Sequence, residues 1–135
     1  MKAPIYAAAA VAVAGLGACS PGVEVGRKSY AGYYRDFCAG CHGANGEGNG
    51  PAAAGLQPAP ANLTQLSARN GGTFPMVAVM SQIDGYRSGP RAMPEFGAFL
   101  VNDRTVMVET APGRFTPAPE RLAGMAEYIE SLQRP

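Results

Sequence analysis

Two segments of the chain carry apolar residues with the period of a helix. In residues 26–41 these residues stand three or four positions apart, which predicts an amphipathic helix. They are Tyr30, Tyr34, Phe37 and Cys41. A second helix is predicted to open at Pro119 and Glu120 and to bury one face. That face comprises Leu122, Met125, Ala126, Ile129 and Leu132, with Tyr128 expected to contact the first helix.

Shorter patterns lie between these two helices. A short helix is predicted to start within residues 62–66, and another is predicted over residues 74–83, with Thr73 as its cap. Residues 105–110 alternate apolar and polar side chains as a strand does, and the turn residues that follow complete a small hairpin near 105–116. The pattern therefore predicts an all-α domain with one small β-hairpin.

Composition adds that much of the domain is loop and that its core is small. The 135 residues include 18 Gly and 12 Pro, many of them in the long loop from Gly43 to Pro60. A small, loop-rich domain usually needs a disulfide network, a metal or a large cofactor for stability. Three cysteines cannot form such a network, so we expect a cofactor. The balance of 11 basic and 10 acidic residues lacks the concentrated basic surface of a nucleic-acid-binding protein.

The first 18 residues are predicted to be an export signal. Lys2 supplies a short basic region, and an apolar stretch from Ile5 to Ala14 follows. The uncharged stretch Ala3 to Ala18 is short for a membrane span, which needs about 20 residues. An uncleaved anchor is the alternative. Export would place the protein on the periplasmic side of a bacterial membrane.

The end of this signal predicts a lipid anchor. Residues 16–19, Leu-Gly-Ala-Cys, resemble a bacterial lipobox, in which the cysteine is lipidated and becomes the first residue. Cys19 is then the lipidation site, residues 19–25 form a tether, and residues 26–133 form the folded domain. Ordinary cleavage nearby, for example after Ala14, is the alternative.

The chemistry of the chain is concentrated in Cys38-Ala39-Gly40-Cys41-His42, which contains the only histidine. A C-x-x-C pair in an oxidising compartment can be a disulfide, a redox-active thiol pair, part of a zinc site or a haem attachment site. Zinc would need more ligands, and a thioredoxin-like motif would follow a strand. The adjacent histidine favours haem, because C-x-x-C-H is the c-type attachment motif. Cys38 and Cys41 would bind the porphyrin covalently, and His42 would ligate the iron.

The chain resembles the class I cytochromes c, and more closely the small monohaem cytochromes c of alphaproteobacteria. The resemblance extends over residues 26–133. It rests on "YYRDFCAGCHGANGEGNGP", "NGGTFPMVAVM", "MPEFG" and "RLAGMAEYIESLQ". It implies a cytochrome c-like fold, in which the N- and C-terminal helices cross around one covalent haem c.

The sixth ligand of the iron is predicted to be Met93. With one histidine, ligation by two histidines of this chain is impossible, and Lys28 is badly placed for the distal face. Met93 stands in a turn-rich loop, and Pro94 favours an extended backbone that can present a thioether to a flat ring. In the family a Met-Pro pair here supplies the distal ligand. The alternative is that Met93 fills a gap in the core.

The remaining methionines and two further positions complete these expectations. Met76 and Met80 are expected to form core that packs against the haem, with ligation by one of them as the alternative, and Met125 is expected in the core. In the family a proline carbonyl accepts the proximal imidazole N–H, for which Pro51 is the first choice and Pro58 the second. The family also favours glycine eight residues before the first cysteine, where this chain has Tyr30.

Together these residues predict a one-electron carrier rather than an enzyme. A haem with both axial positions filled has no site for a small-molecule substrate, and methionine ligation raises its potential. The expected partners are redox proteins, either membrane complexes or periplasmic oxidoreductases. Two alternatives stay open: a dedicated haem subunit of a periplasmic dehydrogenase or oxidase, and a ligand-binding or peroxidatic haem protein. Four arginines are candidates for a positive rim or for binding haem propionates: Arg69, Arg87, Arg91 and Arg104.

Overall fold

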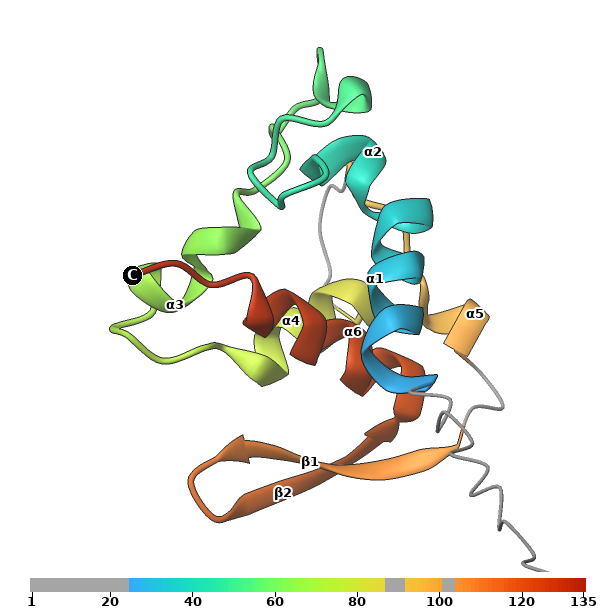
Figure 1. Ribbon diagram of the computed structural model, residues 1–135, viewed down its shortest axis with the longest axis vertical. Coiled ribbons are helices and arrows are strands. Elements are labelled where there is room, and N and C mark those ends of the chain that lie inside the picture. The colour runs from blue at the N-terminus through green and yellow to red at the C-terminus, as the bar shows by residue number, and fades with distance from the viewer. Residues whose placement is uncertain (1–24, 87–91, 101–103) are drawn as a thin grey trace, which may run out of the picture.

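The computed structural model describes residues 25–86, 92–100 and 104–135. Figure 1 shows the order and arrangement of its helices and strands. The longer elements are α1 (Val25–Phe37), α4 (Met76–Asp84), β1 (Thr105–Ala111), β2 (Arg114–Pro119) and α6 (Glu120–Ser131). The short elements are α2 (Ala39–His42), η1 (Pro51–Ala53), η2 (Leu63–Gln65), α3 (Leu66–Arg69) and α5 (Gly97–Leu100). The predicted signal, Cys19 and most of the tether lie outside the described residues.

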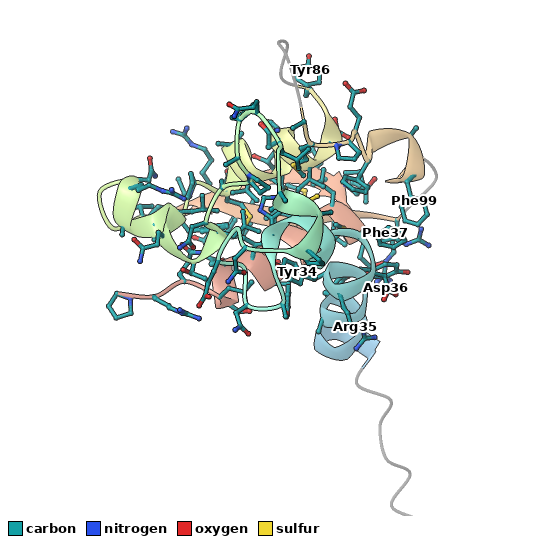
Figure 2. The ribbon with its side chains drawn as sticks, turned by 90° about the horizontal axis from the view of Figure 1, so that it is seen from above. Tyr34, Arg35, Asp36, Phe37, Tyr86 and Phe99 are labelled. Atoms are coloured by element: carbon teal, nitrogen blue, oxygen red, sulfur yellow. The ribbon has the colours of Figure 1, made fainter. Side chains whose placement is uncertain are left out.

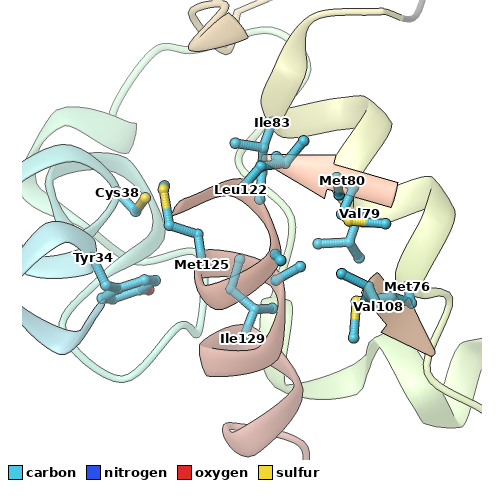
Figure 3. Packing of buried hydrophobic residues seen from close by; sticks show 13 residues of the cluster. Tyr34, Cys38, Met76, Val79, Met80, Ile83, Val108, Leu122, Met125 and Ile129 are labelled. Atoms are coloured by element: carbon cyan, nitrogen blue, oxygen red, sulfur yellow. The ribbon is translucent and has the colours of Figure 1, made fainter. Parts of the chain in front are cut away.

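The last helix, α6, forms the centre of the domain. It packs against α1 and α4, and the β1–β2 hairpin lies beside it (Figure 1). Side chains from all of these elements meet in one hydrophobic core (Figure 3). The core comprises Tyr34, Cys38, Met76, Val79, Met80, Ile83, Val108, Ala118, Leu122, Ala123, Met125, Ala126 and Ile129. The predicted fold, in which the first and last helices meet and a small hairpin is added, is confirmed.

The first predicted helix is broken at its end. α1 stops at Phe37, and α2 begins at Ala39 after Cys38, whose N–H donates to the Tyr34 carbonyl at 2.8 Å. Tyr34 and Cys38 are buried, whereas Phe37 is 46 % exposed. Tyr34 and Cys38 therefore mark the buried side of the segment, and Phe37 lies at the edge of that side.

The crossing of α1 and α6 depends on a glycine of the last helix. A Cβ atom at Gly124 would overlap the ring of Tyr30. The hydroxyl of Tyr30 donates to the Glu120 carbonyl at 3.4 Å, one turn earlier in α6. One turn further along α1, the rings of Tyr34 and Tyr128 lie 5.3 Å apart, which confirms the contact expected of Tyr128. Close approach is thus achieved with the glycine on α6, opposite Tyr30, which stands on α1 where the resemblance implies a glycine.

The helices between the two ends form as predicted, with one correction. The Asn62 side chain accepts a hydrogen bond from the Thr64 N–H at 2.9 Å and so opens η2. The prediction of Thr73 as the cap of α4 is wrong, because Pro75 occupies the cap position of a helix that begins at Met76. The carbonyl of Thr73 instead accepts from the side-chain amide of Asn70 at 2.8 Å.

The hairpin is confirmed and extends further than the sequence pattern suggested. Val106 pairs with Ala118 and Val108 with Thr116, and the register shifts between Glu109 and Ala111. Val108 and Ala118 are buried against the core. The two ends of the hairpin are joined where the Glu120 N–H donates to the Arg104 carbonyl at 2.7 Å, and their side chains form an ion pair.

Within residues 25–86, 92–100 and 104–135, no helix has both the length and the apolar character needed to cross a bilayer.

The contact between Tyr30 and Gly124 gives a first prediction. Replacing Gly124 with Ala improves helix propensity by about 1 kcal/mol, but overpacking typically costs about 1–3 kcal/mol, because the tyrosine ring must move out of its site. We expect a net loss of stability in guanidinium denaturation of the haem protein. In a Tyr30→Ala background the same change should be neutral or stabilising. Equal effects in both backgrounds would contradict the contact.

The buried phenol of Tyr34 gives a second prediction. Its hydroxyl donates to the Gly43 carbonyl at 2.8 Å. Burial is the main cause that raises its pKa to about 12, and repulsion from Cys38 and Tyr128 adds to it in the chain without thioether bonds. The unfolded chain releases this proton near pH 10, so stability should fall as the pH rises from about 10 to 12, by at most about 1.4 kcal/mol per pH unit.

Denaturation between pH 9 and 12 measures this loss. Tyr34→Phe should be less stable at neutral pH, because the Gly43 carbonyl loses its donor, but it should lose less stability at high pH. Tyr86→Phe, at a ring that is 85 % exposed, is the matched control and should keep the wild-type slope. A Tyr34→Phe profile parallel to wild type would refute the assignment.

Candidate cofactor site

A cavity of about 700 Å³ opens beside α2 and brings four predicted site residues together. Its volume lies within the usual range for small-molecule and cofactor pockets. Cys38, Cys41, His42 and Met93 all line it. Most of the remaining lining is apolar: Phe37, Leu56, Pro58, Ala59, Pro60, Ala61, Leu63, Leu66, Pro75, Ala78, Val79, Ile83, Ala92, Pro94, Phe96 and Ile129. An apolar ligand of considerable size would suit this lining.

A single helical turn presents the two thiols and the imidazole. The carbonyl of Cys38 accepts hydrogen bonds from the N–H groups of Cys41 at 3.2 Å and His42 at 2.9 Å. Cys38 and Cys41 do not form a disulfide with each other, and Cys38 is buried while Cys41 is half-buried. Burial, followed by repulsion from Cys41, raises the pKa of Cys38 to about 11. In the folded chain without thioether bonds, this thiol is therefore protonated at neutral pH.

The imidazole of His42 is oriented by a backbone carbonyl. Its Nδ1 lies 2.9 Å from the carbonyl oxygen of Ala61. When Nδ1–H donates to this carbonyl, Nε2 is left with a lone pair for a metal. Such a second contact fixes the ring and makes the nitrogen a stronger donor.

The prediction that the carbonyl of Pro51 or Pro58 accepts from His42 is wrong. The loop folds back so that the Leu63 N–H donates to the Gly46 carbonyl at 2.7 Å, which brings Ala61 to the imidazole. Pro51 lies at the start of η1. The N–H of the preceding residue, Gly50, donates to the Cys41 carbonyl at 3.0 Å.

The turn after His42 requires glycine. Gly43 has a φ of 80°, in the region that other residues rarely adopt. A Cβ atom there would overlap the side chain of Asn49. The Gly43 carbonyl is also the acceptor for the Tyr34 hydroxyl. The chain can therefore reverse directly behind the imidazole while staying tied to α1.

Met93 reaches the cavity from the segment between α4 and α5. The segment is tied to α4 by the Phe96 N–H, which donates to the Ile83 carbonyl at 3.0 Å. Met93 is half-buried, and the amide nitrogen of Gln82 lies 3.9 Å from its sulfur. Met76, Met80 and Met125 are buried in the core, as predicted, but the expected packing of Met76 and Met80 against the haem is wrong, and Met107 is exposed on the hairpin. None of these four methionines lines the cavity.

Aromatic rings and one arginine form part of the cavity's margin. Phe37 lies 6.3 Å from Phe96 and 5.4 Å from Phe99 between ring centroids, and the side chains of Phe37 and Phe99 lie together at one side of the domain (Figure 2). Arg69 lines the cavity and donates to the Asn62 carbonyl. Arg104 pairs with Glu120 and does not line the cavity. Arg87 and Arg91 lie outside the described residues.

Sequence reasoning missed two residues that orient the site. Ala61 acts through its backbone carbonyl, so its side chain gave no signal. Gln82 did give a sequence signal, because it is a polar residue within the mainly apolar sequence Met76–Ile83 of a short helix.

The donor set fits a covalently attached haem. The cavity combines two thiols one turn apart, an oriented imidazole, a thioether and mainly apolar walls. These are the groups that attach and ligate a c-type haem. Among the described residues, no group of three or more His, Cys, Asp and Glu side chains is arranged to hold a metal ion, as a zinc site would require.

Comparison with known families gives the same assignment for nearly all of the domain. The family model described as cytochrome c matches residues 26–133. Comparisons with curated proteins and with solved structures gave no significant match. The chain therefore belongs to the cytochrome c family, whose members hold haem c covalently and typically act as electron carriers rather than enzymes.

Proposed function

We propose that this cytochrome c is a monohaem, one-electron carrier on the periplasmic side of a bacterial membrane. Its haem is bound through Cys38 and Cys41, and the iron is ligated by His42 and Met93. The observation that carries the proposal is that these four side chains line one mainly apolar cavity. If His42 and Met93 both held the iron, no coordination position would be left for a small-molecule substrate, and the haem would supply one-electron transfer.

The haem supplies a one-electron iron couple, and the chain sets the conditions under which it works. The Ala61 carbonyl holds His42 in one orientation. The thioether of Met93 favours the reduced state and so raises the potential. Apolar walls disfavour the additional positive charge of the oxidised state and act in the same direction.

The location and the partners follow from the first residues of the chain. Export through the signal at 1–18 and lipidation at Cys19 would tether the domain to a membrane through residues 19–25. The partners are then membrane complexes or periplasmic oxidoreductases. The near-neutral charge and the single lysine between residues 26 and 133 favour a second candidate, a dedicated haem subunit of a periplasmic dehydrogenase or oxidase. A free carrier commonly uses a concentrated charge for steering.

Replacing Met93 tests the assignment of the distal ligand. The ferric protein should show the weak long-wavelength absorption band of sulfur bound to ferric iron, and Met93→Ala should lose it. The variant should also have a lower potential, and its reduced form should bind carbon monoxide. Met107→Ala, at the exposed methionine of the hairpin, is the matched control and should behave as wild type. A wild-type protein without the band would instead favour the ligand-binding or peroxidatic alternative.

The contact between Gln82 and Met93 predicts a smaller shift of the potential. An N–H donated to the sulfur withdraws electron density that would otherwise stabilise ferric iron. Removing it by Gln82→Leu should lower the midpoint potential by about 20–40 mV, the equivalent of one weak hydrogen bond. The sulfur–iron band should persist. Gln65→Leu, at an exposed glutamine, is the control, and an unchanged potential in Gln82→Leu would exclude the contact in the haem protein.

A further inference from the structure

The outward face of the β1–β2 hairpin is apolar. Met107 is 62 % exposed and Phe115 is 55 % exposed. The strand register places Met107 opposite Pro117 and Glu109 opposite Phe115, so these four residues share one face of the hairpin. An antiparallel sheet with one face on the core usually carries polar residues on the other face. Here Met107, Phe115 and Pro117 place apolar side chains together in the middle of the outward face, beside the charged Glu109.

The core does not account for this face. The opposite face of the hairpin makes the internal contacts, through the buried side chains of Val108 and Ala118. Adjacent apolar side chains that remain exposed commonly mark a surface that binds a protein or a membrane. The outward face is therefore available for a contact outside the domain.

The start of the folded chain lies at the same end of the molecule as the hairpin. α1 begins at Val25 near the hairpin end of the domain (Figure 1). Five residues later, the Tyr30 hydroxyl donates to the Glu120 carbonyl at 3.4 Å. The N–H of Glu120 in turn donates to the Arg104 carbonyl at the base of the hairpin, at 2.7 Å.

The short distance in sequence from Cys19 to Val25 suggests what the outward face contacts. Six peptide steps separate these two residues, so even a fully extended tether spans about 20 Å. We propose that the hairpin face formed by Met107, Phe115 and Pro117 rests on the interface of the bilayer to which Cys19 anchors the chain. This inference rests on the lipid anchor of the proposed function.

The polar groups near this face are compatible with shallow contact. The carboxylate of Glu109 accepts a hydrogen bond from the Gly113 N–H at 2.9 Å, which partly satisfies its charge. Arg114 is exposed beside the turn, where a guanidinium can bind lipid phosphate. No residue of the hairpin lines the haem cavity, so this contact leaves the cavity free for redox partners.

Site-directed spin labelling of the lipidated haem protein in vesicles tests the contact. Haem attachment and lipidation consume all three cysteines, so a label on Met107→Cys or Pro117→Cys would be unique. Ala52→Cys, at an exposed residue of η1, is the matched control. With the haem reduced, labels at 107 and 117 should become several-fold more accessible to oxygen in the bilayer. Their accessibility to a water-soluble nickel chelate should fall by a similar factor, and position 52 should change in neither respect.

The other outcomes separate the hairpin contact from the anchor and from the redox function. If the protein floats with the vesicles but 107 and 117 respond as 52 does, the hairpin contact is refuted and the anchor stands. If the protein does not float with the vesicles, the lipid anchor and the hairpin contact are both refuted. Labels shielded from both reagents would show a protein contact instead of a lipid contact. Reversible reduction of the haem, followed by absorption in each sample, reports the electron-carrier function independently.

Discussion

The cavity beside α2 is the feature on which the rest of the fold depends, because its wall and the hydrophobic core share residues. Cys38, Val79, Ile83 and Ile129 belong to the buried core and also line the cavity. Cys38 lies between α1 and α2, Val79 and Ile83 lie in α4, and Ile129 lies in α6. The shared residues therefore join these elements to one another. Filling the cavity with an apolar macrocycle therefore extends the core, which a domain of this size and loop content needs.

The same arrangement explains how long loops can hold a defined site. The segment after His42 contains only short helical turns before α4, yet it is fixed at particular points by hydrogen bonds. The imidazole is held through Ala61, and the Met93 segment is held through Ile83 and Gln82. His42 and Met93 are thus each oriented by residues elsewhere in the chain, in addition to the hydrogen bonds that the loops make within themselves.

The sequence predicted what depends on neighbouring residues and failed where distant segments meet. The periodic face of α6 and the alternation in β1 are local, and the structure places both in the expected elements, whereas the C-x-x-C-H motif lies on α2 after a break in the predicted first helix. The acceptor for His42 was assigned to the wrong residues because it depends on how the loop folds back, which spacing does not determine. The position of the glycine at the helix crossing could not be predicted from the sequence of α1 alone. The two helices need only one small residue between them, and Gly124 of α6 provides it.

The hairpin is joined to the domain in a way that leaves the haem site undisturbed. Thr105 pairs with Pro119, and Arg104 is joined to Glu120, so the chain leaves and re-enters the domain at nearly the same place. A hairpin whose ends already meet closes at little cost to the elements on either side. Its inner face gains Val108 and Ala118 for the core, while no hairpin residue lines the cavity. The outward face can therefore take on a separate interaction, while the cavity is lined by residues of α2, α4, α6 and the segment that carries Met93.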